Sequence, residues 1–330
     1  MSSQTIVKLM SSNMTSQRTM QTILSISNVL LLPLIGMVVF LGIWSAVANN
    51  LETSLGKFPG PMAVVEQTIG LYDEHQAQAV KEIAFYERQE IRNAKRLAND
   101  PTYEPKIRPF TGVPTFFDQI WTSLYTVGIG FLLASIIAVP LGIMCGLSKS
   151  AYAAINPLIQ LFKPISPLAW LPLVTMVVSA VYVSDDPMFA KSFVTSAVTV
   201  ALCCLWPTLI NTAVGVSSVD SDLLNVSKVL RLNTWTHIQK IILPSSIPMI
   251  FTGLRLSLGI GWMVLIAAEM LAQNPGLGKF VWDEFQNGSS QSLARIMVAV
   301  LTIGVIGFAL DRLMLSLQRA VSWDKSVTLR

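Results

Sequence analysis

Charged residues are scarce in this chain and unevenly distributed. They make up 13% of its 330 residues, whereas soluble chains average about 25%. Of the 23 Lys and Arg and 19 Asp and Glu residues, ten acidic and eight basic ones lie in Leu51–Asp118, so the remainder is almost free of charge. The mean hydropathy is +0.56, and long uncharged apolar runs are typical of membrane spans. The composition therefore predicts a polytopic integral membrane protein.

Cysteine and phosphate-binding motifs are scarce or missing as well. The three cysteines, Cys145, Cys203 and Cys204, lie inside apolar runs without metal-ligand spacing, which predicts buried thiols and no metal site. No G-x-x-x-x-G-K-[ST] phosphate loop occurs, and Gly276–Lys279 lacks its spacing. The net charge of +4 is small and scattered, which argues against nucleic acid as a partner.

Six charge-poor runs approach the length of a membrane span. A helix needs about 20 apolar residues to cross about 30 Å of hydrocarbon. The runs are Val29–Ala48, Ile120–Leu147, Pro164–Ser184, Ser192–Val219, Ile247–Ala268 and Ile296–Leu310. The last run has fifteen residues and reaches spanning length by including part of Gln291–Arg295 or Asp311–Leu317. A secretory signal is the alternative for the first run, which is however long and lacks a small-residue cleavage site before a soluble domain. Small residues that permit close helix packing in lipid are Gly128, Gly130, Gly142, Gly259 and Gly261.

Basic residues in the short connecting segments indicate the orientation. With both ends in the cytoplasm, the inner side holds Lys8, Arg18, Lys149, Lys163, Lys228, Arg231, Lys240, Arg312, Arg319, Lys325 and Arg330. The short outer loops hold only Lys191, Lys279 and Arg295. The chain then divides into a cytoplasmic tail (1–28), a first transmembrane helix (29–48), an external insert (49–118), a transmembrane core (119–317) and a cytoplasmic tail (318–330).

The external insert contains an expected amphipathic helix over Glu66–Ala98. Three- and four-residue steps connect Val80, Ile83, Glu87, Ile91, Ala94 and Ala98. The sequence Asn99, Asp100, Pro101 is expected to end the helix. One interpretation is a docking surface for an external partner, and the other is a helix that lies on the membrane or packs over its own external loops.

The cytoplasmic segment Ser217–Pro244 has the pattern of two short helices. Asp220 or Ser221 can cap a helix over Leu223–Leu232, and Asn233–Trp235 separates it from a second helix over Thr236–Leu243. Such a pair could be a lever gripped by a soluble motor domain, or an interfacial amphipathic helix pair. The apolar residues that could enter a cleft on a partner are Leu224, Val229, Leu230 and Ile238.

This segment resembles the EAA loop of prokaryotic ABC importer permeases, whose pattern is Glu-Ala-Ala, three residues, Gly, nine residues, then Ile-x-Leu-Pro. The matching positions are Asn225, Val226, Ser227, Arg231, Ile241, Leu243 and Pro244. The spacing and the Ile-x-Leu-Pro end match, while the Glu, both alanines and the glycine are replaced. Because the glycine normally permits the turn, we expect the break to move to Asn233, which also tolerates positive φ.

Further stretches resemble the nitrate, sulfonate and bicarbonate branch of these permeases. They are Phe251–Trp262, Ala267–Met270, Pro164–Leu173, Pro140–Ile143 and Gly146–Ser148. Asn225-Val226 and Phe280–Asp283 look most like the nitrate and bicarbonate members. The resemblance covers about Gln119–Leu317, and the insert 66–109 has no counterpart expected in the short members.

The resemblance implies a type I ABC importer transmembrane domain in the bacterial inner membrane. Two copies would form a homodimer, two ATPase subunits would grip the coupling helices Ser221–Leu243, and a periplasmic solute-binding protein would deliver the solute. ATP and Mg would bind the partner subunits, so that this chain is neither an enzyme nor a cofactor carrier. The implied solute is a small oxyanion, nitrate first, with nitrite and cyanate close to it; bicarbonate or an alkanesulfonate such as taurine are the alternatives.

Four residues are candidates for the translocation path or its gating. Ser166 and Trp170 come from the stretch that resembles the family, and Arg255 and Glu269 are the charges within the fifth span. Arg255 could instead snorkel to headgroups or carbonyls, and Glu269 could brace the turn Asn274–Gly278. Because the second, third and fourth runs contain no basic residue, we expect no tight anion site in the permease and selectivity in the binding protein.

Two other classes of protein remain as alternatives. A membrane enzyme would need a metal or nucleophile cluster at membrane depth, but His75 and His237 fall on opposite sides and no span holds a carboxylate pair. A channel or secondary transporter would show inverted repeats or an ion relay, and the sequence shows neither.

Overall fold

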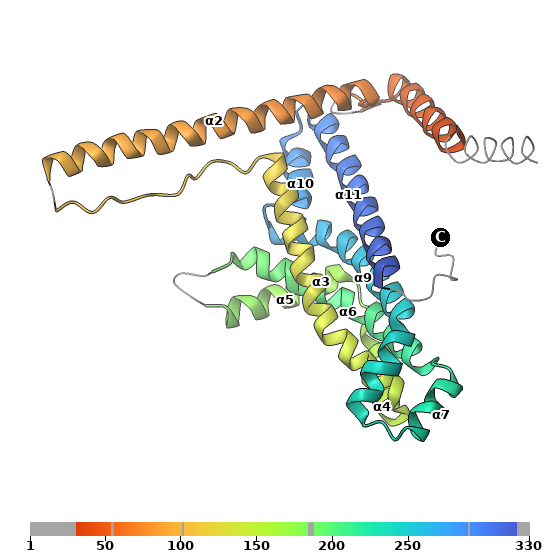
Figure 1. The fold of residues 1–330 in the computed structure, drawn as a ribbon. Coiled ribbons are helices and arrows are strands. Elements are labelled where there is room, and N and C mark those ends of the chain that lie inside the picture. Colours follow the sequence, from red (N-terminus) through yellow and green to blue (C-terminus); the bar gives the residue numbers. More distant parts are fainter. Residues whose placement is uncertain (1–30, 54–55, 101, 184–187, 290, 322–330) are drawn as a thin grey trace, which may run out of the picture. The chain divides into compact units, whose positions relative to one another are not determined.

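The computed structural model describes residues 31–53, 56–100, 102–183, 188–289 and 291–321 (Figure 1). The expectations for the two cytoplasmic tails, including Lys8, Arg18, Lys325 and Arg330, lie outside these residues. The chain forms two units, residues 1–66 and 67–330, and each is described by itself.

The first unit contains the first expected span and a short hairpin. The helix Leu31–Asn50 is long and apolar enough to cross a membrane. It is followed by strands β1 (Glu52–Thr53) and β2 (Gly56–Lys57), which pair in antiparallel fashion. The indole Nε1 of Trp44 donates to the carbonyl of Pro59 at 3.0 Å, which ties the end of the helix to the segment after the hairpin.

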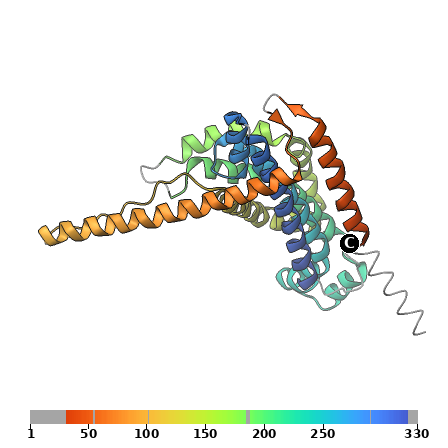
Figure 2. The ribbon, with the colours of Figure 1, turned by 90° about the horizontal axis from the view of Figure 1, so that it is seen from above.

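Helix α2 (Pro61–Asn99) confirms the expected helix in the insert and extends it at its N-terminal end. The helix ends where the sequence predicts, and Asp100 accepts hydrogen bonds from the backbone and hydroxyl of Thr102, which lower the pKa of the Asp100 carboxyl. Figures 1 and 2 both show the following segment returning alongside α2.

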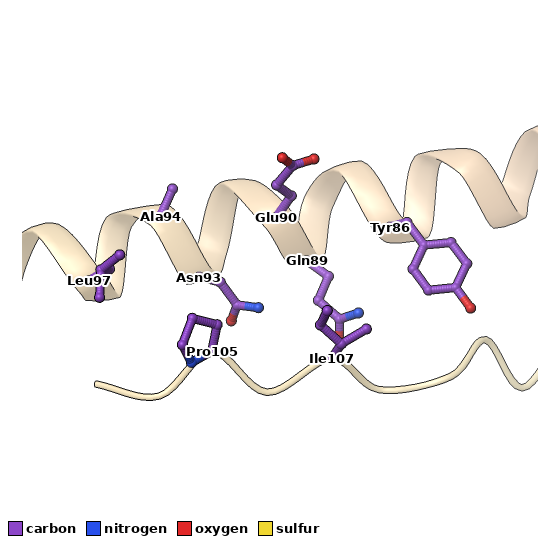
Figure 3. A pocket seen from close by; sticks show the side chains of 8 residues that line it. All are labelled: Tyr86, Gln89, Glu90, Asn93, Ala94, Leu97, Pro105 and Ile107. Atoms are coloured by element: carbon purple, nitrogen blue, oxygen red, sulfur yellow. The ribbon is translucent and has the colours of Figure 1, made fainter. Parts of the chain in front are cut away.

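The face of α2 that holds the return segment is polar. Gln89 is 3% exposed, accepts from the backbone N–H of Arg108 at 2.9 Å and donates to its carbonyl at 3.2 Å. Asn93 and Tyr86 point toward the same segment, while Glu90 points away (Figure 3). The cavity between α2 and the return segment has a volume of about 380 Å³. Hydrogen bonds between Gln89 and Arg108 connect the helix to the segment beside it. The predicted apolar stripe faces outward, with Val80, Ile83 and Ile91 exposed, so it does not form the packing face of α2.

Three long helices form the centre of the second unit: α3 (Phe116–Leu147), α6 (Lys191–Ser217) and α9 (Leu243–Ala272). A capping box fixes the start of α3, because Thr115 accepts from the N–H of Asp118 and Asp118 accepts from the N–H of Thr115. Helix α6 packs along α3 on one side and α9 on the other. These helices, with α11, account for four of the expected spans.

Glycines permit this close packing. At Gly142, an added Cβ would lie 2.6 Å from Cβ of Thr212 and 2.8 Å from the carbonyl of Leu209 on α6. The other glycines with such close contacts between these helices are Gly130, Gly146, Gly215, Gly253 and Gly261. The packing role expected from the sequence is therefore confirmed for Gly130, Gly142 and Gly261, whereas an added Cβ at Gly128 or Gly259 would meet nothing within 4 Å.

The third expected span differs from the prediction. Instead of one helix over Pro164–Ser184, the chain forms α4 (Lys149–Phe162) and α5 (Pro167–Val181), bent by 101° at the break between them. The segment Lys163–Ser166 contains Pro164 and is followed by Pro167. Because proline has no backbone N–H, these two residues interrupt the helical hydrogen bonds. Among the described residues, five helices are therefore long enough to span a membrane, or six if the bent pair counts as one span.

The last span is longer than its charge-free run. Helix α11 (Ser292–Val321) incorporates both flanks that the sequence offers, including Arg295 and Asp311. Helix α10 (Leu277–Asn287) precedes it and packs against α9, α11 and the start of α3. The two flanking charges enter the helix because each has a partner of opposite charge, described below.

Candidate coupling segment and transport path

The expected pair of short helices is present in the segment that we call the lever, which consists of helix α7 (Ser221–Val229), helix α8 (Thr234–His237) and the π-helix η1 (Ile238–Ile242). Asp220 caps α7 by accepting from the N–H of Asp222 at 2.9 Å, as one of the two expected caps. Asn233 caps α8 by accepting from the N–H of Thr236 at 2.7 Å. Helix α7 ends at Val229, three residues before the expected end.

The turn between α7 and α8 stays at the glycine position of the EAA pattern. Arg231, which stands at that position, has φ of 47°, in the left-handed region. Asn233 has φ of −68°, so the expected move of the break to Asn233 is wrong. The fold keeps the turn and places a non-glycine residue in a conformation that costs about 1–2 kcal/mol.

The second helix of the lever also differs from the prediction. It does not stop before Pro244, because η1 continues directly into α9. Pro244 has no N–H to donate to the carbonyl of Lys240, and its ring would contact that carbonyl in a regular α-helix. The wider π-turn before Pro244 accommodates the ring, and the N–H of Leu243 bonds to the carbonyl of Ile238 instead. The lever is therefore joined rigidly to the fifth span.

Ser227 holds the two helices of the lever together. It is 5% exposed, and its hydroxyl lies 2.6 Å from Nδ1 of His237. The sequence indicated Ser227 as part of the EAA pattern but did not indicate His237. Leu224 and Ile241 pack inward beside the buried cluster Val216, Val219 and Ile242.

Four apolar side chains of the lever are more than half exposed, and we call them the coupling patch. They are Val226, Val229, Leu230 and Trp235, between 51% and 81% exposed. Val229 and Leu230 were expected to be free for a partner, and Trp235 was not recognised from the sequence. Leu224 and Ile238, also expected at such a surface, are instead half-buried. The remaining residues of the EAA pattern, Asn225, Leu243 and Pro244, are exposed.

The candidates Ser166 and Trp170 lie at the bend between α4 and α5. Ser166 caps α5 by accepting from the N–H of Leu168 at 3.3 Å. Trp170 packs against Phe162 with ring centroids 5.7 Å apart, and Phe162 stacks on Trp206 of α6 at 5.9 Å. These rings border a cavity of about 190 Å³. Its lining residues are Phe162, Lys163, Ile165, Pro167, Trp170, Leu202, Cys203, Trp206, Pro207 and Ile260.

Arg255 is paired within the core. Its guanidinium forms a two-pronged ion pair with Asp311 of α11, with Nη2 2.8 Å from Oδ2 and Nε bonded to Oδ1. Both side chains are about one-third exposed in the single chain. The sequence located both charges but not their pairing, because they lie on different spans. Snorkelling is therefore not how Arg255 is accommodated.

Glu269 is fully buried and holds the turn after α9. It accepts from the hydroxyl of Ser123 on α3 at 2.8 Å and from the N–H of Gly278 at 2.9 Å. Ser123 also accepts from the N–H of Leu277 at 2.9 Å. An added Cβ at Gly276 would lie 2.1 Å from Oε1 of Glu269, so only glycine fits beside the carboxylate. This geometry is the brace considered from the sequence; a gating role for Glu269 stays a prediction.

A second charge cluster, not recognised from the sequence, lies at the opposite end of the core from the coupling segment. Arg295 of α11 binds Glu74 of α2 at 2.7 and 2.9 Å and Glu284 of α10 at 2.7 Å. His75 of α2 adds a hydrogen bond of 2.8 Å to the hydroxyl of Thr115. The insert helix is therefore attached to the core through polar contacts. Among the described residues, no three His, Cys, Asp or Glu side chains cluster as a metal site would require.

A core of close-packed apolar helices that carries an exposed lever on one side defines the transmembrane component of an ABC-type transport system. Residues 138–323 match the family described as binding-protein-dependent transport system inner membrane component, and the chain belongs to this family. It is therefore an integral membrane protein of a transport system, and in bacteria such components lie in the inner membrane.

The comparisons with individual proteins narrow the branch. The chain is 36% identical to the nitrate import permease protein NrtB of Synechococcus elongatus over 204 residues, 62% of this chain and 69% of that protein. It is 33% identical to the bicarbonate transport system permease protein CmpB of the same organism over 291 residues, 88% of each chain. The fold resembles the inward-facing MetNI methionine ABC transporter, with a TM-score of 0.53 at 13% identity, covering 63% of this chain and 96% of that one.

Proposed function

We propose that this chain is the permease subunit of an ATP-driven importer for a small monovalent oxyanion, with nitrate as the first candidate. The observation that carries the proposal is the lever, whose turn keeps the EAA register at Arg231 and whose coupling patch is exposed in the part of the chain that the structure describes. Exposed apolar side chains on a cytoplasmic connection between membrane spans suit a cleft on a soluble motor. The identity with nitrate permeases supports the solute.

The proposed complex contains two copies of this chain, two ATPase subunits and a periplasmic solute-binding protein. ATP and Mg bind the ATPase subunits, whose closure moves the two levers. Because η1 runs into α9 without a break, motion of the lever reaches the fifth span directly. The binding protein supplies the solute to the outward-open path.

Reconstitution tests this proposal. The chain is co-expressed with the ATPase subunits and the binding protein, purified through one tag, and placed in liposomes that contain ATP. We expect a stable complex and uptake of isotope-labelled nitrate that requires both ATP and the binding protein. Transport by the chain alone without ATP would instead support a channel or secondary transporter and contradict the proposal.

Bicarbonate is the second candidate, and the length of one alignment favours it. An alignment that covers 88% of this chain cannot fit outside Leu51–Asp118, so the bicarbonate permease CmpB shares at least part of the insert. The nitrate permease alignment is short enough to lie within residues 119–330, outside the insert. Parallel uptake of labelled nitrate, bicarbonate and taurine by the same liposomes separates these solutes, and the one that competes with the others at the lowest concentration is the substrate.

A further inference from the structure

The cavity at the bend between α4 and α5 lies halfway along the spanning helix α6. Helix α6 runs from Lys191 to Ser217, and its central residue is Cys204. The α6 residues that line the cavity, Leu202, Cys203, Trp206 and Pro207, are no more than one turn from this centre. On α9, Ile260 lies close to the middle of the apolar run Ile247–Ala268.

Helix α4 rises from the cytoplasmic end of the core to this level. Its first turn, with Lys149 and Tyr152, lies beside Ser217 at the inner end of α6. Further along, Ile155 and Ile159 pack with Leu205 and Leu209. Phe162 then stacks on Trp206, and Lys163 follows at the cavity. Lys163, which the sequence placed in a cytoplasmic loop, therefore lies near mid-membrane.

Lys163 has no ion-pair partner in the part of the chain that the structure describes. Among the residues that the structure describes, no carboxylate forms an ion pair with Lys163, and none of the residues lining the cavity is acidic. Arg255, the other basic side chain at this level, is neutralised by Asp311. The positive charge of Arg255 is thus balanced by a carboxylate, whereas that of Lys163 is not balanced by any residue that the structure describes.

Lipid is an unsuitable surrounding for this lysine. A basic side chain at the bilayer centre costs about 2.5–3.5 kcal/mol or more. The stem of lysine is far shorter than half of the roughly 30 Å hydrocarbon core, so the ammonium cannot reach the headgroups. Lys163 is exposed in the single chain. The exposed side of the cavity is therefore expected to face water, as a translocation path would.

The walls of the cavity are largely aromatic. Phe162 stacks on Trp206 and packs against Trp170, and all three rings line the cavity. Lys163 therefore offers one positive charge beside aromatic rings that suit a weakly hydrated, planar solute.

We propose that Lys163 and the aromatic rings beside it form an anion-binding station halfway along the translocation path, with room for one small monovalent oxyanion. The proposal rests on the proposed function and adds to it a residue-level site that replaces the expectation of a path without basic residues. A single uncompensated charge binds a monovalent anion weakly and briefly. Weak binding suits a transport path, because the path must release the anion again. Selection of the solute can still occur in the binding protein.

Transport by the reconstituted complex is the first test. We expect Lys163→Gln to lower the maximal uptake rate at saturating loaded binding protein about tenfold or more, while the KM set by the binding protein stays unchanged. Lys163→Arg keeps the charge and should retain most of the rate. Trp206→Phe keeps an aromatic wall and should also retain most of the rate. Lys149→Gln, at the other end of α4, is the matched control and should transport normally.

An unchanged uptake rate for Lys163→Gln, in a complex that elutes as the parent complex does, overturns the station but leaves the proposed function standing. Failure of the parent complex to take up any labelled oxyanion instead overturns the proposed function.

A labelling experiment tests the station without transport. Lys163→Cys is introduced into the complex after Cys145, Cys203 and Cys204 are replaced by alanine, and it is treated with a sulfonate-bearing methanethiosulfonate reagent that does not cross lipid. We expect labelling that sodium nitrate slows and that sodium gluconate at equal ionic strength does not. Absence of labelling, or equal labelling in both salts, overturns the station.

Discussion

The core helices and the coupling segment bury their residues in opposite ways. In α3, α6 and α9, the positions that decide the packing are glycines in contact with a neighbouring backbone, as at Gly142. In the coupling segment, by contrast, large apolar side chains such as Leu230 are exposed instead of packed. We therefore expect the thermal stability of the chain to depend on the core glycines and the coupling to the ATPase to depend on the exposed residues of the lever. Single substitutions should then change one property without the other.

Leu230→Asp should have the largest effect, and on coupling alone. A carboxylate at a side chain that is 63% exposed costs the single chain little, but it cannot enter an apolar cleft. We expect ATP-dependent uptake to be lost while the Tm of the purified chain stays unchanged. The conservative Leu230→Met should retain uptake, and Arg231→Glu should also impair it. Normal uptake by both Leu230→Asp and Arg231→Glu would show that the lever lies elsewhere.

Gly142→Ala should produce the reverse result. The added methyl group would overlap Thr212 and the carbonyl of Leu209, and such overpacking costs about 1–3 kcal/mol. We expect a lower Tm of the purified chain, measured by the temperature at which its size-exclusion peak is lost. Gly128→Ala, on the same helix but without a neighbour within 4 Å, is the control and should be neutral or slightly stabilising. Equal Tm values for the two variants would refute the close approach of α3 and α6.

Asp311→Asn tests whether the ion pair inside the core contributes to the stability of the chain, as the glycine contacts do. The substitution leaves Arg255 without its carboxylate partner at membrane depth. We expect a moderate fall in Tm, and a smaller fall when Arg255→Gln is added, because removing both charges is less unfavourable than isolating one. If the double variant is less stable than Asp311→Asn, the pair does not act as a neutralised unit.

Arg231→Gly should have the smallest effect and a favourable sign. Glycine adopts the left-handed backbone of this turn without the steric cost that Arg231 bears, and we expect a gain of about 1 kcal/mol, partly offset by the freedom of glycine in the unfolded chain. If the lever requires the left-handed turn and not the guanidinium of Arg231, the variant should still take up the solute. A strong loss of uptake would assign the arginine side chain a contact with the motor.

Local sequence patterns were sufficient for several elements. The cap of α7 at Asp220 and the end of α2 before Pro101 follow from neighbouring residues. The glycines needed the structure, because Gly128 was expected to pack as Gly142 does and has no neighbour within 4 Å of an added Cβ. The position of the lever followed from motif spacing. By contrast, the break expected at Asn233 was wrong: the left-handed turn lies at Arg231, two residues earlier, and the hydrogen bond between Ser227 and His237 joins the helices on either side of it.

The sequence by itself determined that this chain is a membrane protein and where most of its spans lie, because hydropathy acts over a few turns of chain. The expected lever was located by its resemblance to a family motif and not by hydropathy or capping. Only the tertiary structure decided that Arg255 is neutralised by Asp311 and that Arg295 joins Glu74 to Glu284. It also decided that the bend after α4 brings Lys163 to the middle of α6. Each of these depends on groups far apart in the chain, and the energy of a charge in a membrane depends on which groups surround it rather than on its neighbours in sequence.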